Sequence, residues 1–430
     1  MTDPRKQRDS AAAKKRLKQR YSAERRFQFF GLAAISFGVL ALAVLLWSIL
    51  GAGWSAFSRT VISLEVKFDP EILGVSSDAD RSSLEEADYY TLVRRSIYQA
   101  FPEVSGRSEK KQLNKLFSSD ASLELREFVL EKPELIGSVG RVEVDASSDL
   151  DQLHKGNAPR EIEESYRRIT DLQLAWYDKL LAEGKIRSVF NWEFFASGDS
   201  RSAELAGIGG AVKGSFFTLI ICFLLAFPIG VAAAIYLEEF APNNRWTELI
   251  EVNINNLAAV PSIIFGLLGL AIILNLFGLP RSTPIAGGIV LALMILPVII
   301  IACRASLKAV PPSIRQGALA LGASPTQVVF HHVLPLALPG TLTGTIIGLG
   351  RALGETAPLL MIGMVAFIVD VPEGFNDAAT VLPVQIYLWA ESAERGFVEK
   401  TAAAIMIILT FLVFMNAVAV YLRQKFERRW

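Results

Sequence analysis

The chain has 430 residues, of which 52% are hydrophobic, and its 43 basic and 43 acidic side chains cancel to a formal net charge of zero. This composition excludes an ordinary soluble protein, because the chain is too apolar for its charge content. The two cysteines, Cys222 and Cys303, both fall in apolar stretches. We interpret them as packing residues and not as a disulfide or a metal pair.

The first 27 residues are expected to form a solvated basic tail on the cytoplasmic side. Residues 1–26 hold ten lysines and arginines against three acids, and such clusters favour the cytoplasm. An uncharged run, Phe29–Leu50, follows and is long enough to cross a bilayer. We therefore predict a transmembrane helix within 28–57. We expect it to be retained, because this run is longer than the apolar part of a usual signal peptide.

Residues 58–208 are expected to form an inserted α+β domain. Apolar and polar residues alternate over 62–68 and again over 142–145, as in half-buried strands. Residues 162–180 carry apolar side chains at helical spacing, which predicts an amphipathic helix. One preceding span places this domain outside the cytoplasm. His154 is its only histidine and it has no cysteine, so we expect a structural or docking role without a metal.

Five further spans are predicted in a membrane core over 209–422, followed by a basic cytoplasmic tail over 423–430. With the first helix they give a six-helix, all-α polytopic membrane protein with both termini in the cytoplasm. The acidic connection 238–256 runs against this orientation, although acids weigh little in the rule. The predicted spans are Gly214–Leu237, Leu257–Phe277, Ile285–Cys303, Thr341–Ile368 and Thr401–Leu422, with kinks expected at Pro228, Pro261, Pro297 and Pro358.

A loop over 309–340 carries strong helix start and stop signals. Pro311-Pro312 suits a helix start, and Gly322 suits the position after a helix end, where positive φ is needed. Ser324–Gln327 matches a capping box with proline at the first helical position. We predict two short helices hinged at the glycine, the second of which ends at Pro335 and Pro339.

The fifth predicted span carries an arginine and a carboxylate. Counting from Thr341 at about 1.5 Å per residue places Arg351 near the middle of an apolar layer about 30 Å thick. Glu355 lies one turn further on the same face. Charges at such depth usually face a bundle interior or a water path. We predict that Arg351, Glu355 and the adjacent Thr356 line a substrate path, and the alternative is a structural ion pair between helices.

Glycines at four-residue spacing precede and flank this pair. Small residues at such spacing let helices approach closely, so a packing role is expected for Gly344, Gly348, Gly350 and Gly354, together with Gly340.

Two of these segments resemble a known family. The loop resembles the EAA loop of ABC-importer permeases, although Gln316 stands where an acid is usual and His332 where an isoleucine is usual. The stretches Asn256–Gly266 and Arg351–Leu360 resemble the PstA family of phosphate permeases. The resemblance covers roughly the C-terminal half, from about Gly207.

The resemblance implies the core fold of type I ABC importers and a non-catalytic subunit in the bacterial inner (plasma) membrane. It also implies three partners: a PstC-like paralogous permease, a dimer of PstB-like ATPase subunits and a PstS-like extracytoplasmic phosphate-binding protein. The residues that would dock the ATPase are Gln316, Gly317, Ala318, Gly322, Ala323 and Ser324.

The energy source is expected to lie in a partner. The chain has no Gly-x4-Gly-Lys-Ser/Thr phosphate loop, so we expect no bound cofactor, no metal and no ATP hydrolysis by this chain. Two alternatives stay open: a permease for sulfate or molybdate, and a membrane sensor or signalling subunit. A membrane enzyme is least favoured, because no catalytic triad or metal cluster is recognisable.

Overall fold

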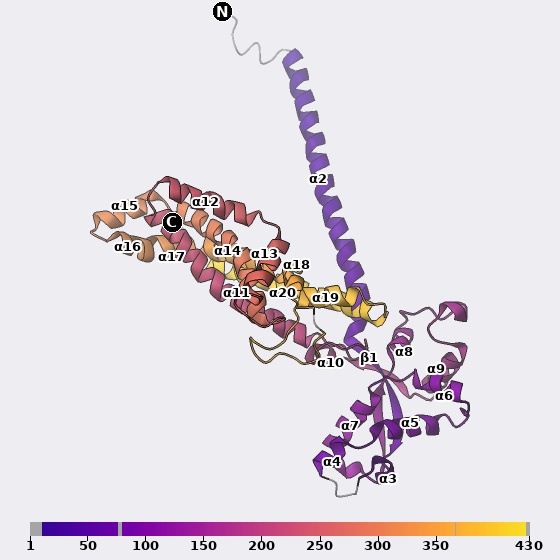
Figure 1. Cartoon of the computed structure of the whole chain (residues 1–430). Coiled ribbons are helices and arrows are strands. Elements are labelled where there is room, and N and C mark those ends of the chain that lie inside the picture. Colours follow the sequence, from indigo (N-terminus) through magenta and orange to yellow (C-terminus); the bar gives the residue numbers. More distant parts are fainter. Residues whose placement is uncertain (1–10, 76–79, 366, 427–430) are drawn as a thin grey trace, which may run out of the picture. The chain divides into compact units, whose positions relative to one another are not determined.

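The computed structural model describes residues 11–75, 80–365 and 367–426, which fall into two units, 1–52 and 53–430 (Figure 1). The described residues of the first unit all belong to one long helix, α2 (Ala11–Gly53). Residues 11–27 of the predicted tail are helical, and the side chains of residues 15–27 are exposed. This stretch has no glycine or proline and is rich in alanine, lysine and arginine, all good helix formers. Residues 1–10 of the predicted tail lie outside the described residues.

The inserted domain is built around a three-stranded antiparallel sheet of order β2-β1-β3. Strand β1 (Ser58–Lys67) pairs with β2 (Val139–Asp145), which sets Ile62 opposite Val144. Strand β3 (Ile186–Phe190), which the sequence analysis missed, pairs with the other edge of β1. Ile62, Leu64 and Val66 of β1 are buried and pack under the surrounding helices, so this sheet holds the core of the domain.

Short helices surround the sheet, and one of them is shorter than predicted. The amphipathic helix expected over 162–180 begins only at Asp171, because Thr170 and Gln173 form a reciprocal capping box. Tyr166 is exposed, outside this helix. The helices are α3 (Pro70–Leu73), α4 (Arg81–Glu85), α5 (Tyr89–Ala100), α6 (Arg107–Asn114), α7 (Ala121–Glu131), α8 (Ser148–His154), α9 (Asp171–Ala182) and α10 (Glu193–Ala196).

A buried ionic cluster closes one end of the sheet. Arg59 Nη1 lies 2.9 Å from Asp145 Oδ2, and Glu124 Oε2 accepts the backbone N–H of Asp145 at 2.8 Å. Burial raises the pKa of Glu124 to about 8, and the charge of Asp145 adds to the shift. Burial also raises the pKa of Asp145 to about 6, against the opposing pull of Arg59. The cluster therefore holds more acid than its arginine neutralises.

The helical core contains the remaining apolar helices. Among the described residues, five helices including α2 are long and apolar enough to cross a membrane, or six if a bent pair counts as one span. Proline does not break α11 or α14: Pro228 and Pro297 lie inside continuous helices. The core helices are α11 (Gly209–Ile235), α12 (Arg245–Ala258), α13 (Ser262–Leu268), α14 (Pro284–Lys308), α15 (Pro312–Ala320), α16 (Pro325–Gln327), α17 (Leu334–Gly354), α18 (Ala357–Met361), α19 (Leu382–Ala390) and α20 (Gly396–Phe426).

The third predicted span is not one kinked helix. Helices α12 and α13 are separate and meet at 104° beside Pro261, which caps α13. Proline pushes the preceding residue out of the helical region, and α12 has already ended at Ala258. The connection predicted over 238–256 is therefore largely helical, since α12 begins at Arg245 behind the N-cap Asn244.

The second loop helix and the fifth span are one helix. A single 30-residue helix runs from Pro325 to Gly354, so the prediction that Pro335 and Pro339 end a helix is wrong. A π-helical stretch, Val328–Val333, precedes Pro335, which then falls in the first turn of α17. The local shift of the hydrogen-bond pattern in the π-helical stretch lets the helix accommodate this proline without breaking.

Close glycine contacts hold α17 against α14 at Gly340 and Gly344, but not at the glycines that follow. A side chain at Gly344 would overlap Ala302, and one at Gly340 would overlap Ser306. Gly348 and Gly350 are in ordinary contact distance of neighbours, and no atom lies within 4 Å of the Cβ position of Gly354. The predicted packing role therefore fits Gly344 best, and it is wrong for Gly354 among the described residues.

We predict that Gly344→Val destabilises the chain by about 1–3 kcal/mol, because the added side chain overpacks the α14–α17 contact. Gly354→Val is the matched control and should melt close to wild type. Cys222 and Cys303 are buried free thiols, so their labelling by a thiol-reactive dye during heating reports unfolding. Equal melting of the two variants would contradict the packing role.

A second prediction concerns pH. A carboxyl whose pKa is raised by folding holds its proton more tightly when folded, so stability falls as pH rises from its ordinary value of 4.5 to about 8 for Glu124. We expect Glu124→Gln to flatten this decline, by up to about 1.4 kcal/mol per pH unit, and to be more stable than wild type near pH 8. Thermal unfolding across this pH range measures it. Glu127→Gln, at an exposed position on the same helix, should keep the wild-type slope.

Candidate functional site

The predicted charged pair lies at the end of α17. Arg351 Nε is 3.4 Å from Glu355 Oε1, and the side chains are 51% and 17% exposed. Arg351 is in the last turn of a helix that began at Pro325, so it lies near one end of that helix. Glu355 follows the helix with an extended backbone. The pair therefore lies at the end of α17, and about half of the Arg351 side chain is exposed to solvent.

The chain breaks directly after this pair. Thr356 precedes α18, and its carbonyl accepts the N–H groups of Leu359 at 3.1 Å and Leu360 at 3.0 Å. Its side chain makes no capping hydrogen bond. Pro358 is in the first turn of α18, so it starts a new helix and does not bend α17. Arg351, Glu355 and Thr356 thus share one helix break.

The break is packed against α13. A Cβ at Gly266 would lie 2.6 Å from Pro358 Cα, so only glycine allows α13 to approach so closely. Pro261 starts α13 at the sharp bend described above. The two stretches that carried the family resemblance, 256–266 and 351–360, are therefore neighbours in space.

Buried polar groups that the sequence analysis missed lie behind Ala352 and Leu353. A small cavity of about 10 Å³ there is also lined by Ser215 and Thr218. Thr218 Oγ1 has no hydrogen-bond partner among the described residues, and Ser215 Oγ accepts the N–H of Leu382 at 2.8 Å. A signal was present in the sequence as two hydroxyls three residues apart in an uncharged span, but such hydroxyls are common in membrane helices.

The predicted docking loop lies at the opposite end of the Pro325–Gly354 helix. Gln316 and Gly317 are exposed on α15, Ala318 is buried, and Ala323 is half-buried. Gly322 has φ +87°, the conformation that glycine adopts without strain.

A reciprocal capping box starts the long helix. Ser324 N–H donates to Gln327 Oε1 at 2.9 Å, and Gln327 N–H donates to Ser324 Oγ at 3.3 Å. The beginning of the helix is thus fixed directly behind the loop.

Ion pairs connect the loop and α14 to the acidic segment 238–256. Arg315 Nη2 lies 2.7 Å from Glu239 Oε1 and also donates to the Leu307 carbonyl at 2.9 Å. Arg304 Nη2 lies 2.6 Å from Glu251 Oε1. The acids that seemed out of place in 238–256 are therefore partners of basic residues on α14 and α15.

His331 and His332, adjacent in the π-helical stretch, are exposed. No group of three or more His, Cys, Asp or Glu side chains in the described part of the chain is arranged to hold a metal ion.

Comparison with known families matches both parts of the chain. Residues 226–428 match the model described as binding-protein-dependent transport system inner membrane component. Residues 14–164 match a domain of unknown function, DUF3333. The inserted domain continues beyond that match, because β3 at 186–190 completes its sheet.

Individual relatives agree with the first match. The chain is 35% identical to YqgI of Bacillus subtilis over 173 residues, which cover 40% of this chain and 58% of that one. It is 30% identical to the Haemophilus influenzae phosphate transport system permease protein PstA over 224 residues, covering 52% and 78%. The PstC permease protein of the same organism is 32% identical over 227 residues, covering 47% and 70%.

Among solved structures, a MetNI methionine ABC transporter chain aligns with a TM-score of 0.43 at 19% identity, covering 51% of this chain and 98% of that one.

Fold and site together define a polytopic membrane protein with an exposed loop at one end of a long helix and a charged pair at the other. The chain belongs to the family of binding-protein-dependent transport system inner membrane components.

Proposed function

We propose that the chain is the transmembrane permease subunit of an ATP-dependent importer of inorganic phosphate. One observation carries the proposal: the docking loop and the Arg351–Glu355 pair lie at the two ends of one continuous helix. At about 1.5 Å per residue this helix is about 45 Å long. A rigid element of this length transmits a displacement at the loop to the arginine.

The chemistry of the pair favours phosphate. A guanidinium remains charged and offers two parallel donors that match the oxygens of an oxyanion. Hydrogen phosphate carries a proton that it can donate to Glu355, whereas sulfate has none at neutral pH and meets only repulsion from the carboxylate. The PstA and PstC relatives are phosphate transport permeases by name, which supports the same cargo here.

The exposed surfaces suit the proposed partners. Half of the Arg351 side chain is accessible, which leaves room for a paralogous permease to complete the path. Exposed Gln316, Gly317 and Leu321 offer a docking surface for an ATPase dimer. ATP is then used by that dimer, and this chain is non-catalytic and binds no cofactor.

The proposed orientation follows from the loop. With the loop and both termini on the cytoplasmic side of a bacterial inner membrane, the Arg351 end of the long helix and the inserted domain face outward. An extracytoplasmic phosphate-binding protein would deliver its cargo on that side.

The first test replaces the charged pair. Arg351→Lys keeps the charge but loses the planar fork, so we expect phosphate uptake to fall about tenfold or more while the complex still assembles. Glu355→Gln should lose the preference for phosphate over sulfate. Radiolabelled uptake in a deletion strain, with co-purification of the partner subunits as the control, measures both. Full uptake with unchanged selectivity in Glu355→Gln would sink the proposed role of the carboxylate.

The second test concerns docking. No atom lies within 4 Å of the Cβ position of Gly317, so Gly317→Arg fits the fold of this chain. We expect it to block ATPase docking and abolish ATP-driven uptake, while the chain alone melts as wild type does. Normal co-purification of the ATPase and normal uptake would contradict the docking role.

A further inference from the structure

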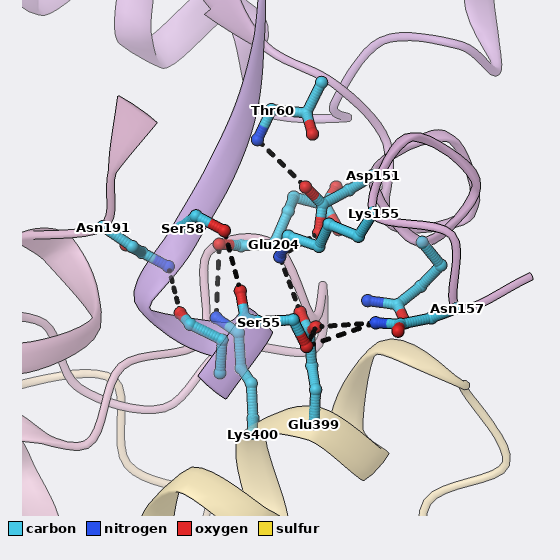
Figure 2. A network of polar contacts seen from close by, with 12 residues as sticks. Ser55, Ser58, Thr60, Asp151, Lys155, Asn157, Asn191, Glu204, Glu399 and Lys400 are labelled. Carbon is cyan, nitrogen blue, oxygen red and sulfur yellow. Dashed lines mark hydrogen bonds and ion pairs between the residues drawn. The ribbon is translucent and has the colours of Figure 1, made fainter. Parts of the chain in front are cut away.

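Buried charges join the inserted domain to the helical core (Figure 2). Lys155 Nζ, just after α8, lies 2.8 Å from Glu399 Oε1 in the first turn of α20. The same Nζ lies 2.6 Å from Oδ2 of Asp151, which is on α8. The side chains of Lys155 and Glu399 are 6% and 5% exposed. A buried charge of the core is therefore neutralised by the inserted domain.

The remaining oxygens of both carboxylates are also used. Glu399 Oε2 accepts Ser55 Oγ at 2.6 Å and Asn157 Nδ2 at 3.2 Å. Asp151 Oδ1 accepts the backbone N–H of Thr60, in β1, at 2.9 Å. The group thus fixes the start of the sheet, α8 and the first turn of α20 to one another.

The next residue on α20 points to a different segment. Lys400 Nζ donates to the carbonyls of Ala206 and Glu204, which lie in the lead into α11. Its ammonium also lies 5.5 Å from the ring centre of Phe194. Close packing adds to this, since a Cβ at Gly396 would overlap Ser148 and lie 2.7 Å from Ala203 Cβ. The first turn of α20 is therefore clamped from two sides.

A buried ionic group adds little to the stability of a fold, because desolvation offsets much of the attraction. Apolar residues of similar volume often stabilise the folded state equally well. Its geometric demands instead define one relative position of the segments it joins. Helix α20 also contacts α17 further along its length, since Leu412 lies 3.5 Å from the Cβ position of Gly350 on α17. Gly350 precedes Arg351 directly.

We propose that Lys155 and Glu399 are positioning residues for transport. Through them the inserted domain fixes the first turn of α20, and α20 in turn sets the Arg351 end of α17. The effect on uptake rests on the proposed function, whereas the effect on α17 does not.

The test variant is Glu399→Gln, which keeps an oxygen for Ser55 and Asn157 and leaves Lys155 paired with Asp151. Lys155 keeps the Asp151 carboxylate and Lys400 keeps its two carbonyl acceptors, so each buried ammonium retains a polar partner and we expect the variant to fold. The matched control is Glu103→Gln: Glu103 Oε1 also lies 2.8 Å from a lysine, Lys179, but within the inserted domain and exposed. Lys155→Arg retains the charge and is the conservative variant.

Full-length chains assembled with their partner subunits are reconstituted in nanodiscs for hydrogen–deuterium exchange and in proteoliposomes for phosphate uptake. We expect Glu399→Gln to raise exchange over 397–406 and over 349–356. Maximal uptake should fall about 5- to 10-fold, with less than a twofold change in the KM for the loaded binding protein. Glu103→Gln should match wild type, and Lys155→Arg should remain close to it.

Unchanged exchange over 349–356 in Glu399→Gln would overturn the proposal, even if α20 itself loosens, because the link would then be merely structural. Uptake equal to that of Glu103→Gln would overturn it as well. If wild-type proteoliposomes take up no phosphate, the proposed function fails, and the exchange measurements alone decide the positioning role.

Discussion

The continuity of the Pro325–Gly354 helix is the constraint on which the arrangement of the helical core depends. Two prolines interrupt its hydrogen bonding, yet it does not break. A π-helical stretch directly precedes Pro335, and such a local shift of the hydrogen-bond pattern is one way in which an apolar helix satisfies the backbone groups that a proline leaves unpaired. If the helix were broken there, the loop and the Arg351–Glu355 pair would lie on two separate helices, and their relative position would not be fixed.

The two ends of this helix are held unequally. At the loop end Val328, Val329 and Val333 are buried, and in the middle of the helix Gly340 and Gly344 let α14 approach so closely that a side chain would collide. Towards Arg351 the contacts loosen, and around Gly354 there is open space. Tight packing transmits force and loose packing permits local adjustment. The loop end is therefore suited to transmitting a displacement, and the Arg351 end to local rearrangement.

Local signals in the sequence were read correctly where they act within a few residues. The Ser324–Gln327 capping box and the positive φ of Gly322 form as predicted, as do strands at 62–68 and 142–145. The errors arose where distant contacts decide. β3 is short and mostly exposed, so only its pairing with β1 defines it. A helix end was predicted at Pro335 and Pro339 because a proline looked like a boundary, whereas a π-helical stretch precedes Pro335 and the helix continues to Gly354.

The ion pairs of the chain differ in how deeply they are buried and in which elements they connect. Arg315–Glu239 and Lys155–Glu399 each bridge two different elements, and their acids are largely buried. Separating such a pair would strand a charge away from water, which is strongly unfavourable. Arg351 and Glu355 are instead neighbours on one turn, 3.4 Å apart, with the guanidinium half in the open. Pairs with an exposed member are held by less energy than fully buried ones, so the Arg351 side chain is held less firmly than Lys155. Of these three ion pairs, it is the one with the most exposed basic side chain.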